Sequence, residues 1–109
     1  MHEGDDETVY MLEGEMTAVI DGTPHRLAAG QSIFLARGVP HQLINISRRP
    51  AHYILIGTPA IFDRFLEEAG RELAPGEAAE PPTPVELDRL RTASSKFGII
   101  LLSAFPAKD

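Results

Sequence analysis

The chain has 109 residues, contains no cysteine and carries a formal net charge of −6. That length is typical of one domain, and the absence of cysteine excludes a disulfide framework, a thiolate metal site and a cysteine nucleophile. The acidic balance disfavours a surface that binds nucleic acid. No apolar stretch approaches the roughly 20 residues that a membrane span requires, and the acidic first residues differ from a signal peptide. We therefore expect a cytoplasmic protein that contacts neither a membrane nor nucleic acid.

Residues 8–57 have the pattern of short β-strands separated by turns. Segments of strand-forming residues end at turn signals such as Gly14 and the Asp21-Gly22 pair. Turns at such short intervals favour an antiparallel sandwich or barrel over alternating strands and helices. We predict a small all-β barrel, whose strands cover residues 8–12, 16–20, 25–27, 32–35, 41–46 and 51–56.

A first helix is predicted directly after the strands. Thr58 suits its N-cap and Pro59 its first helical residue. Gly70 can end the helix. Between them, apolar residues recur at helical spacing, at Phe62, Phe65, Leu66 and Ala69. We expect the two phenylalanines to anchor the helix by packing, not to form a substrate platform.

A second helix is predicted to begin at Thr83, because Glu86 stands three residues later and completes a capping box. The stretch between the two helices, residues 74–82, is rich in proline and small residues and is expected to form neither helix nor strand. After the second helix, residues 99–105 suit one more strand.

Two glycine-punctuated segments carry the residues that could do chemistry. In the first, four residues separate His2 from Glu7 and six more separate Glu7 from Gly14. The second is a series of four residues, Gly30, Gly38, His41 and Asn45. These segments resemble the two motifs of the cupin superfamily, G(X)5HXH(X)3–4E(X)6G and G(X)5PXGXXH(X)3N. The chain looks most like a small quercetin-dioxygenase-like monocupin, although Ala36 stands where the second motif has proline.

The resemblance implies an all-β fold, a double-stranded β-helix or jelly-roll-like barrel followed by two short C-terminal helices. Residues 1–57 would form the barrel, and residues 58–109 a helical extension packed on it within a single domain. It also implies one divalent transition metal (Fe, Mn, Ni, Cu or Zn), held by His2, Glu7 and His41. The first histidine of the HXH motif would fall at position 0, so the chain is expected to begin inside the first motif.

The resemblance further implies dioxygenase-type oxidoreductase chemistry on a small oxygenated or aromatic substrate. Glu7 would then be catalytic, shifting from metal ligand towards proton acceptor. Two alternatives remain open from the sequence. One is a ligand-binding or regulatory protein without turnover, in which the metal is structural or absent. The other is that the sequence is the barrel part of a longer polypeptide that starts upstream of Met1.

Inward-facing side chains of a small barrel can line a ligand pocket. Four residues are predicted to do so, Val9, Met11, Leu43 and His52, although apolar residues such as the first three are most often core residues. His25 is expected to be exposed.

Because the strands that precede HXH in the family are missing, one edge of the barrel should lie open. Residues 98–105 or a strand from a partner could cover that edge, so a homodimer is predicted.

Overall fold

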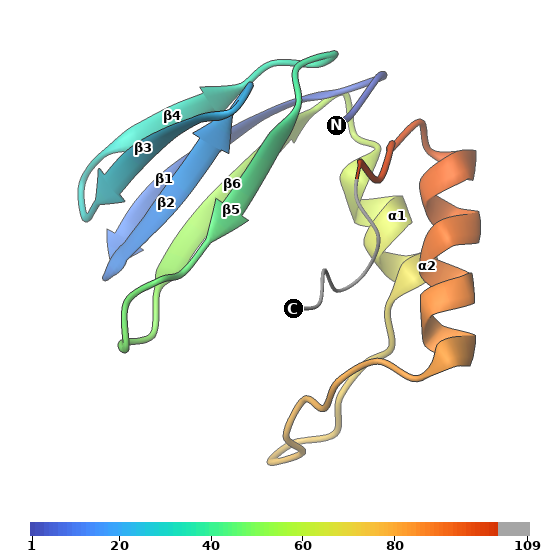
Figure 1. Ribbon diagram of the computed structural model, residues 1–109. Coiled ribbons are helices and arrows are strands. Elements are labelled where there is room, and N and C mark those ends of the chain that lie inside the picture. Colours follow the sequence, from blue (N-terminus) through green and yellow to red (C-terminus); the bar gives the residue numbers. More distant parts are fainter. Residues whose placement is uncertain (103–109) are drawn as a thin grey trace.

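Six strands and two helices follow one another in the computed structural model, which describes residues 1–102 (Figure 1). They are β1 (Asp6–Glu13), β2 (Glu15–Ile20), β3 (Thr23–Ala28), β4 (Ser32–Leu35), β5 (His41–Ile44), β6 (His52–Thr58), α1 (Phe62–Ala69) and α2 (Pro84–Lys96). The β-rich order with two trailing helices is the one expected from the sequence. None of the helices in residues 1–102 is long and apolar enough to cross a membrane.

The strands form two antiparallel sheets of three strands each. One sheet has the order β4-β1-β6 and the other the order β3-β2-β5 (Figure 1). Each sheet is therefore built around a central strand, β1 or β2. The expected barrel is not closed, because no strand of one sheet forms a ladder with a strand of the other within the part of the chain that the structure describes. The architecture is two facing sheets that leave one side open.

The turns follow from glycine at positions where the backbone needs a positive φ. Asp21 and Gly22 have φ values of 48° and 83° and join β2 to β3, as a tight hairpin turn of two residues with positive φ requires. Gly14, between β1 and β2, has a φ of 76°, and a Cβ atom there would lie 2.5 Å from the carbonyl oxygen of Pro50. Both predicted turns are confirmed.

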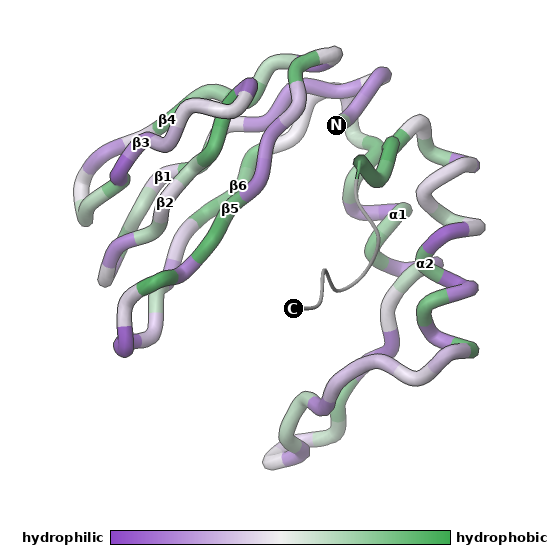
Figure 2. Tube along the Cα trace, in the orientation of Figure 1, coloured by the Kyte–Doolittle hydropathy of each residue, from purple (hydrophilic) through white to green (hydrophobic). Residues whose placement is uncertain are grey.

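The main core lies between the two sheets. It contains five buried side chains, Val9, Met11, Met16, Leu27 and Leu35. Hydrophobic and hydrophilic positions are interspersed along the strands (Figure 2), because successive side chains of a strand point to opposite faces. A second cluster holds the helices together and consists of Phe65, Ala93 and Ile99, with Phe62, Ala69, Leu90 and Phe97 partly buried around it.

The start of the first helix differs from the prediction. Thr58 is the last residue of β6 and pairs with Asp6 of β1, so its backbone is extended and bonded into the sheet. Helix α1 therefore begins only at Phe62, after the Thr58–Pro59 bond, which is cis. Ladder pairing overrides the local capping signal at Thr58. The end of the helix, at Ala69 with Gly70 as C-cap, agrees with the prediction.

The second helix begins as the sequence predicts. The Thr83 hydroxyl accepts a hydrogen bond from the Glu86 backbone N–H at 3.2 Å, and the Glu86 carboxylate accepts one from the Thr83 N–H at 2.8 Å. This reciprocal pair is the capping box. The connector over residues 74–82 contains neither helix nor strand, also as expected.

The N-terminal residues pair with the segment that follows α2. The Met1 amino group donates to the Ile100 carbonyl at 2.9 Å, and the Ile100 N–H donates to the Met1 carbonyl at 2.7 Å. His2 and Ile99 form an isolated antiparallel bridge. The strand expected over 99–105 is thus only a bridge in its described part, and residues 103–105 lie outside the described residues.

Candidate metal centre

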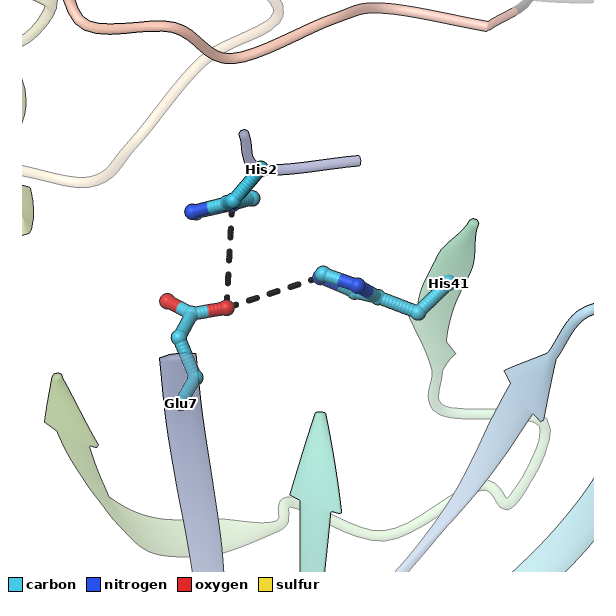
Figure 3. A group of neighbouring side chains, drawn as sticks. All are labelled: His2, Glu7 and His41. Atoms are coloured by element: carbon cyan, nitrogen blue, oxygen red, sulfur yellow. Dashed lines mark ion pairs between the residues drawn. The ribbon is translucent and has the colours of Figure 1, made fainter. Parts of the chain in front are cut away.

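Three side chains meet between the sheets, namely those of His2, Glu7 and His41, the last of which is distant in sequence from the other two (Figure 3). The Glu7 Oε1 atom lies 3.6 Å from Nε2 of His2 and 3.5 Å from Nε2 of His41. One donor atom from each residue falls within 4.8 Å of the others. The structure therefore brings together the three residues that the sequence singled out as metal ligands.

Glu7 owes its position to the alternation of β1. It lies on the same side of the strand as the core residues Val9 and Met11, and it is only 3% exposed. In the sheet it stands opposite Leu35 of β4 and Gly57 of β6. A carboxylate on the central strand of a sheet is therefore fixed in direction by both neighbouring strands.

His41 begins β5, directly after the Gly38-Val39-Pro40 turn, and pairs with Ile20 of β2. Its Nδ1 lies 3.3 Å from the Val39 carbonyl oxygen. A carbonyl can only accept, so Nδ1 carries a proton, and in the neutral imidazole Nε2 keeps its lone pair. The Nε2 atom is the one that faces Glu7.

His2 is held by its backbone and by a buried carboxylate. Its carbonyl accepts a hydrogen bond from the Gly38 N–H at 2.7 Å, and its strand bridge to Ile99 fixes the other side. Its Nδ1 lies 2.9 and 3.1 Å from the two carboxylate oxygens of Asp5, which is 1% exposed. By the same reasoning as for His41, Nδ1 donates to Asp5, and Nε2 of the neutral ring faces Glu7 with a lone pair that can bind a metal.

The arrangement fits a divalent transition metal. As neutral rings, both imidazoles present an Nε2 lone pair to the same carboxylate, and Glu7 Oε2 is buried without a hydrogen-bond partner. Buried carboxylate oxygens are rarely left without a partner, and a cation would satisfy this one. Two donors bound at ~2.1 Å to one ion lie about 3 to 3.5 Å apart, close to the separations seen here. Imidazole and carboxylate donors suit iron, manganese, nickel, copper and zinc alike.

The three residues line one end of a cavity of about 740 Å³. The wall contributed by the strands includes Leu43, Tyr53 and Leu55, and the wall contributed by the start of α1 includes Phe62 and Leu66. The lining is thus mainly apolar with a cluster of polar donors at one end, which is the usual character of a site for a small organic molecule. The Phe62 ring lies 5.5 Å from the His2 ring, centroid to centroid.

The other residues predicted for the pocket lie in different places. Leu43 lines the cavity, whereas Val9 and Met11 are fully buried in the core between the sheets, outside the cavity lining. His52 faces away from the cavity, with a side chain that is 68% exposed and 3.8 Å from Glu13. His52 and Tyr53 are successive residues of β6 and point to opposite faces of the sheet. Tyr53 faces the cavity, so the prediction that His52 lines it is wrong.

Two further placements concern residues of the motifs and of the prediction. His25 is exposed in β3, as expected. Asn45 has a structural role at the turn after β5, where its amide donates to the Arg49 carbonyl at 2.8 Å and its oxygen accepts from Ser47.

Sequence reasoning missed Asp5 and the contribution of α1. Asp5 belongs to the acidic run before Glu7, which has the composition of a solvent-exposed N-terminal segment. Asp5 is two residues before Glu7 and points to the same side as Glu7, whereas Asp6 points to the other side and bonds to Arg37. Period-two alternation extended backwards from the strand could have identified it. Phe62 was expected only as a packing anchor. It does stack on Phe65 at 5.4 Å, but it also lines the cavity.

Comparison with known proteins identifies the family to which this chain is similar. Residues 1–57 match the family described as "Cupin domain". The chain is 28% identical over 81 residues to the tetracenomycin polyketide synthase protein TcmJ of Streptomyces glaucescens, covering 74% of this chain and 54% of that protein. It is 38% identical over 61 residues to the HTH-type transcriptional regulator PuuR of Escherichia coli strain K12, covering 56% of this chain and 32% of the regulator. The chain thus spans about half and about a third of these relatives.

A solved structure supports the same assignment. The protein TT1209 from Thermus thermophilus superimposes with a TM-score of 0.52 at 36% identity, over 54% of this chain and 56% of that one. The expected all-β, jelly-roll-like class is therefore confirmed, with the difference that the two sheets are not closed into a barrel. The match over residues 1–57 covers more than half of the sequence, and we conclude that the chain belongs to the cupin family.

Proposed function

We propose that this chain is a metal-dependent cupin that binds a small organic molecule, with His2, Glu7 and His41 as the metal ligands. One observation carries the proposal. Two imidazole Nε2 atoms face one buried carboxylate, at 3.6 and 3.5 Å, at the end of a largely apolar cavity. Two histidines and one carboxylate are also the protein ligands of non-haem iron oxygenases, so the activity we propose is dioxygenase-type oxidation.

The protein's own residues would each have a defined task. Asp5 and the Val39 carbonyl hold the protons of the two imidazoles on Nδ1, so that both Nε2 atoms remain free to bind. A bound divalent metal supplies Lewis acidity and, for iron, the activation of dioxygen. By shifting from metal ligand towards proton acceptor, Glu7 could take up a proton released by a ligand hydroxyl group.

The cavity favours a substrate with an apolar or aromatic body. Its walls offer aliphatic and aromatic side chains from two strands and one helix, and desolvating such walls against an apolar ligand supplies binding energy of about 25 cal/mol per Å². Oxygen atoms on the substrate would lie at the His2 and Glu7 end. We therefore propose a small oxygenated aromatic molecule as the substrate class.

Metal content tests the proposal directly. Protein purified without a histidine tag should contain one equivalent of a transition metal, or take it up from added Fe²⁺, Mn²⁺, Ni²⁺, Cu²⁺ or Zn²⁺, as measured by elemental analysis after gel filtration. His41→Ala should abolish stoichiometric binding. His25→Ala is the matched control, because His25 is exposed in β3 and does not line the cavity. Retained stoichiometric binding by His41→Ala would reject the ligand set.

Oxygen uptake separates the dioxygenase from a binder. With Fe²⁺ loaded, wild-type protein should consume dioxygen in the presence of a flavonol or catechol probe, and Glu7→Gln should not. A metal-loaded protein that binds these probes without consuming oxygen contradicts the enzymatic part of the proposal.

A second candidate function is a ligand-binding cupin without turnover. The specific observation in its favour is the 38% identity to part of a protein named as a transcriptional regulator. In this case the same cavity would hold a ligand, and its binding would change the activity of another part of a larger assembly. Ligand-induced stabilisation against heat, without product formation, would be its signature.

A further inference from the structure

The cavity carries a second carboxylate, which the metal centre does not use. Asp63 lies in the first turn of α1 and lines the cavity. It is exposed, whereas Glu7 is buried, so Asp63 lies where the cavity opens to solvent. It does not belong to the group of side chains whose donor atoms lie within 4.8 Å of one another. A ligand in the cavity would therefore meet Glu7 at its inner end and Asp63 at its outer end.

No positive charge of the described chain balances Asp63. Within residues 1–102, none of the lysine and arginine side chains lines the cavity. The Asp63 carboxylate forms no ion pair and no hydrogen bond with any of these residues. Glu68 on the same helix differs, because it pairs with Lys96 at 2.9 Å. The Asp63 carboxylate is therefore available to a ligand.

Asp63 also suits the helix that carries it. A carboxylate in the first turn stabilises a helix by its interaction with the macrodipole, and α1 has no side-chain cap. That role requires a negative charge near the start of the helix, whatever the cavity contains. Only a ligand role connects Asp63 with the charge of the molecule that binds, so the two roles can be separated by experiment.

The rest of the outer wall also favours a cation over an anion. Tyr53 of β6 and Phe62 of α1 line the cavity together with Asp63. Aromatic rings attract ammonium groups through their electron-rich faces. Carboxylates and phosphates are ordinarily bound by arginine or lysine, and the described wall contains neither.

We infer that Asp63 selects the charge of the ligand, which carries a protonated amine at the end that lies away from the metal donors. This inference rests on the proposed function, because it requires a ligand whose oxygen atoms lie at the His2 and Glu7 end. The ammonium group would donate a hydrogen bond to the Asp63 carboxylate. An exposed ion pair raises affinity by a factor of about two to five, and an anion in the same place is repelled by a similar factor, so a preference of about tenfold for amine over carboxylate is expected.

Three catechols of similar size and different charge test the inference. Ethylcatechol is neutral, dopamine carries an ammonium group, and dihydroxyphenylacetate carries a carboxylate. Their dissociation constants are measured by isothermal titration calorimetry on Zn²⁺-loaded protein, because Zn²⁺ has no redox chemistry of its own. Wild-type protein should bind dopamine about tenfold more tightly than dihydroxyphenylacetate, with ethylcatechol between them. The preference should shrink at high salt, because salt screens exposed charges.

Substitutions on α1 assign the preference to one residue. Asp63→Asn should lower the preference to about twofold or less, and Asp63→Glu, which keeps the charge, should retain it. Glu67→Gln is the matched control, because Glu67 is an exposed carboxylate of the same helix that does not line the cavity. It removes the same charge from the protein and should leave the preference unchanged. Thermal unfolding followed by circular dichroism shows that each variant is folded, and Asp63→Ser replaces Asp63→Asn if the latter is not.

The outcomes separate this inference from the function on which it rests. Equal affinity of wild-type protein for dopamine and dihydroxyphenylacetate overturns the inference and leaves the proposed function intact. A tenfold preference that persists in folded Asp63→Asn overturns it as well. Protein that binds Zn²⁺ but none of the three catechols contradicts the proposed substrate class, and protein that binds no Zn²⁺ contradicts the metal centre. The inference falls with either of these results.

Discussion

Replacing Asp5 by asparagine should weaken metal binding without removing any ligand. The Asp5 carboxylate lies 2.9 and 3.1 Å from Nδ1 of His2, and both residues are buried. A carboxylate only accepts hydrogen bonds, so it keeps the imidazole proton on Nδ1. An asparagine can turn its NH₂ group towards Nδ1 and so favour the tautomer with the proton on Nε2. That proton would then occupy the position from which His2 binds a metal.

The size of the effect follows from the role of such partners. Loss of a carboxylate that orients a metal-bound histidine typically lowers metal affinity by about 10- to 100-fold, or about 1.4 to 2.8 kcal/mol. The assay is a competition titration of Zn²⁺ against a chromophoric chelator, with urea unfolding of the metal-free protein measured in parallel. The second measurement detects any loss of folding, and the affinity is compared only between folded variants.

Asp6→Asn is the control for this experiment. Asp6 is the adjacent carboxylate, but it points away from the site and bonds to Arg37. Its replacement should change zinc affinity by less than twofold. An Asp5→Asn protein that binds zinc as tightly as wild type would refute the positioning role of Asp5. A wild-type protein that binds no zinc would instead refute the metal site itself.

Other predictions concern the scaffold. Gly14→Ala places a methyl group 2.5 Å from the Pro50 carbonyl in a residue with positive φ, so the free energy of unfolding should fall by more than the ~1 to 2 kcal/mol that positive φ alone costs. Gly22→Ala, which meets no atom within 4 Å, should cost only the smaller amount; equal losses would contradict the clash. Thr83→Ala should destabilise the protein by about 1 kcal/mol through loss of the cap of α2, measured by urea unfolding. The pKa of Glu86 is held below its usual 4.5 chiefly because its carboxylate accepts from the Thr83 N–H. The contribution of Glu86 to stability is therefore complete above pH 4.5 and lost as the pH falls through the lowered value, and Glu86→Gln should flatten the dependence of the melting temperature on pH in that range.

The strand pattern and the grouping of His2, Glu7 and His41 were predictable because their signals are local. Strand β4 covers residues 32–35 in both prediction and structure, and glycine marks the turns at Gly14 and Gly22. The spacing of Glu7 and His41 from their glycines carried the likeness to the family. Alternation within β1 then places Glu7 on the same face as the core residues Val9 and Met11.

The remaining features depend on contacts between distant residues. Thr58 has the chemistry of an N-cap, but pairing with Asp6 keeps it in a strand. Whether the two sheets close into a barrel is decided by pairing between strands that no local pattern reports. The inward direction of Tyr53, and the outward direction of His52, likewise depend on the register of β6 against β1.

The bridge between His2 and Ile99 makes the proposed metal site depend on residues from both halves of the chain. The adjoining bond from Met1 to Ile100 spans 99 residues, so part of what holds His2 in place forms only when the N-terminal residues meet the segment after α2. Closing so long a loop has a large entropic cost, and the unfolded chain cannot assemble the three donors. A metal that binds only the complete fold would stabilise it by mass action. Metal uptake during refolding would therefore report the pairing of residues 1–2 with residues 99–100.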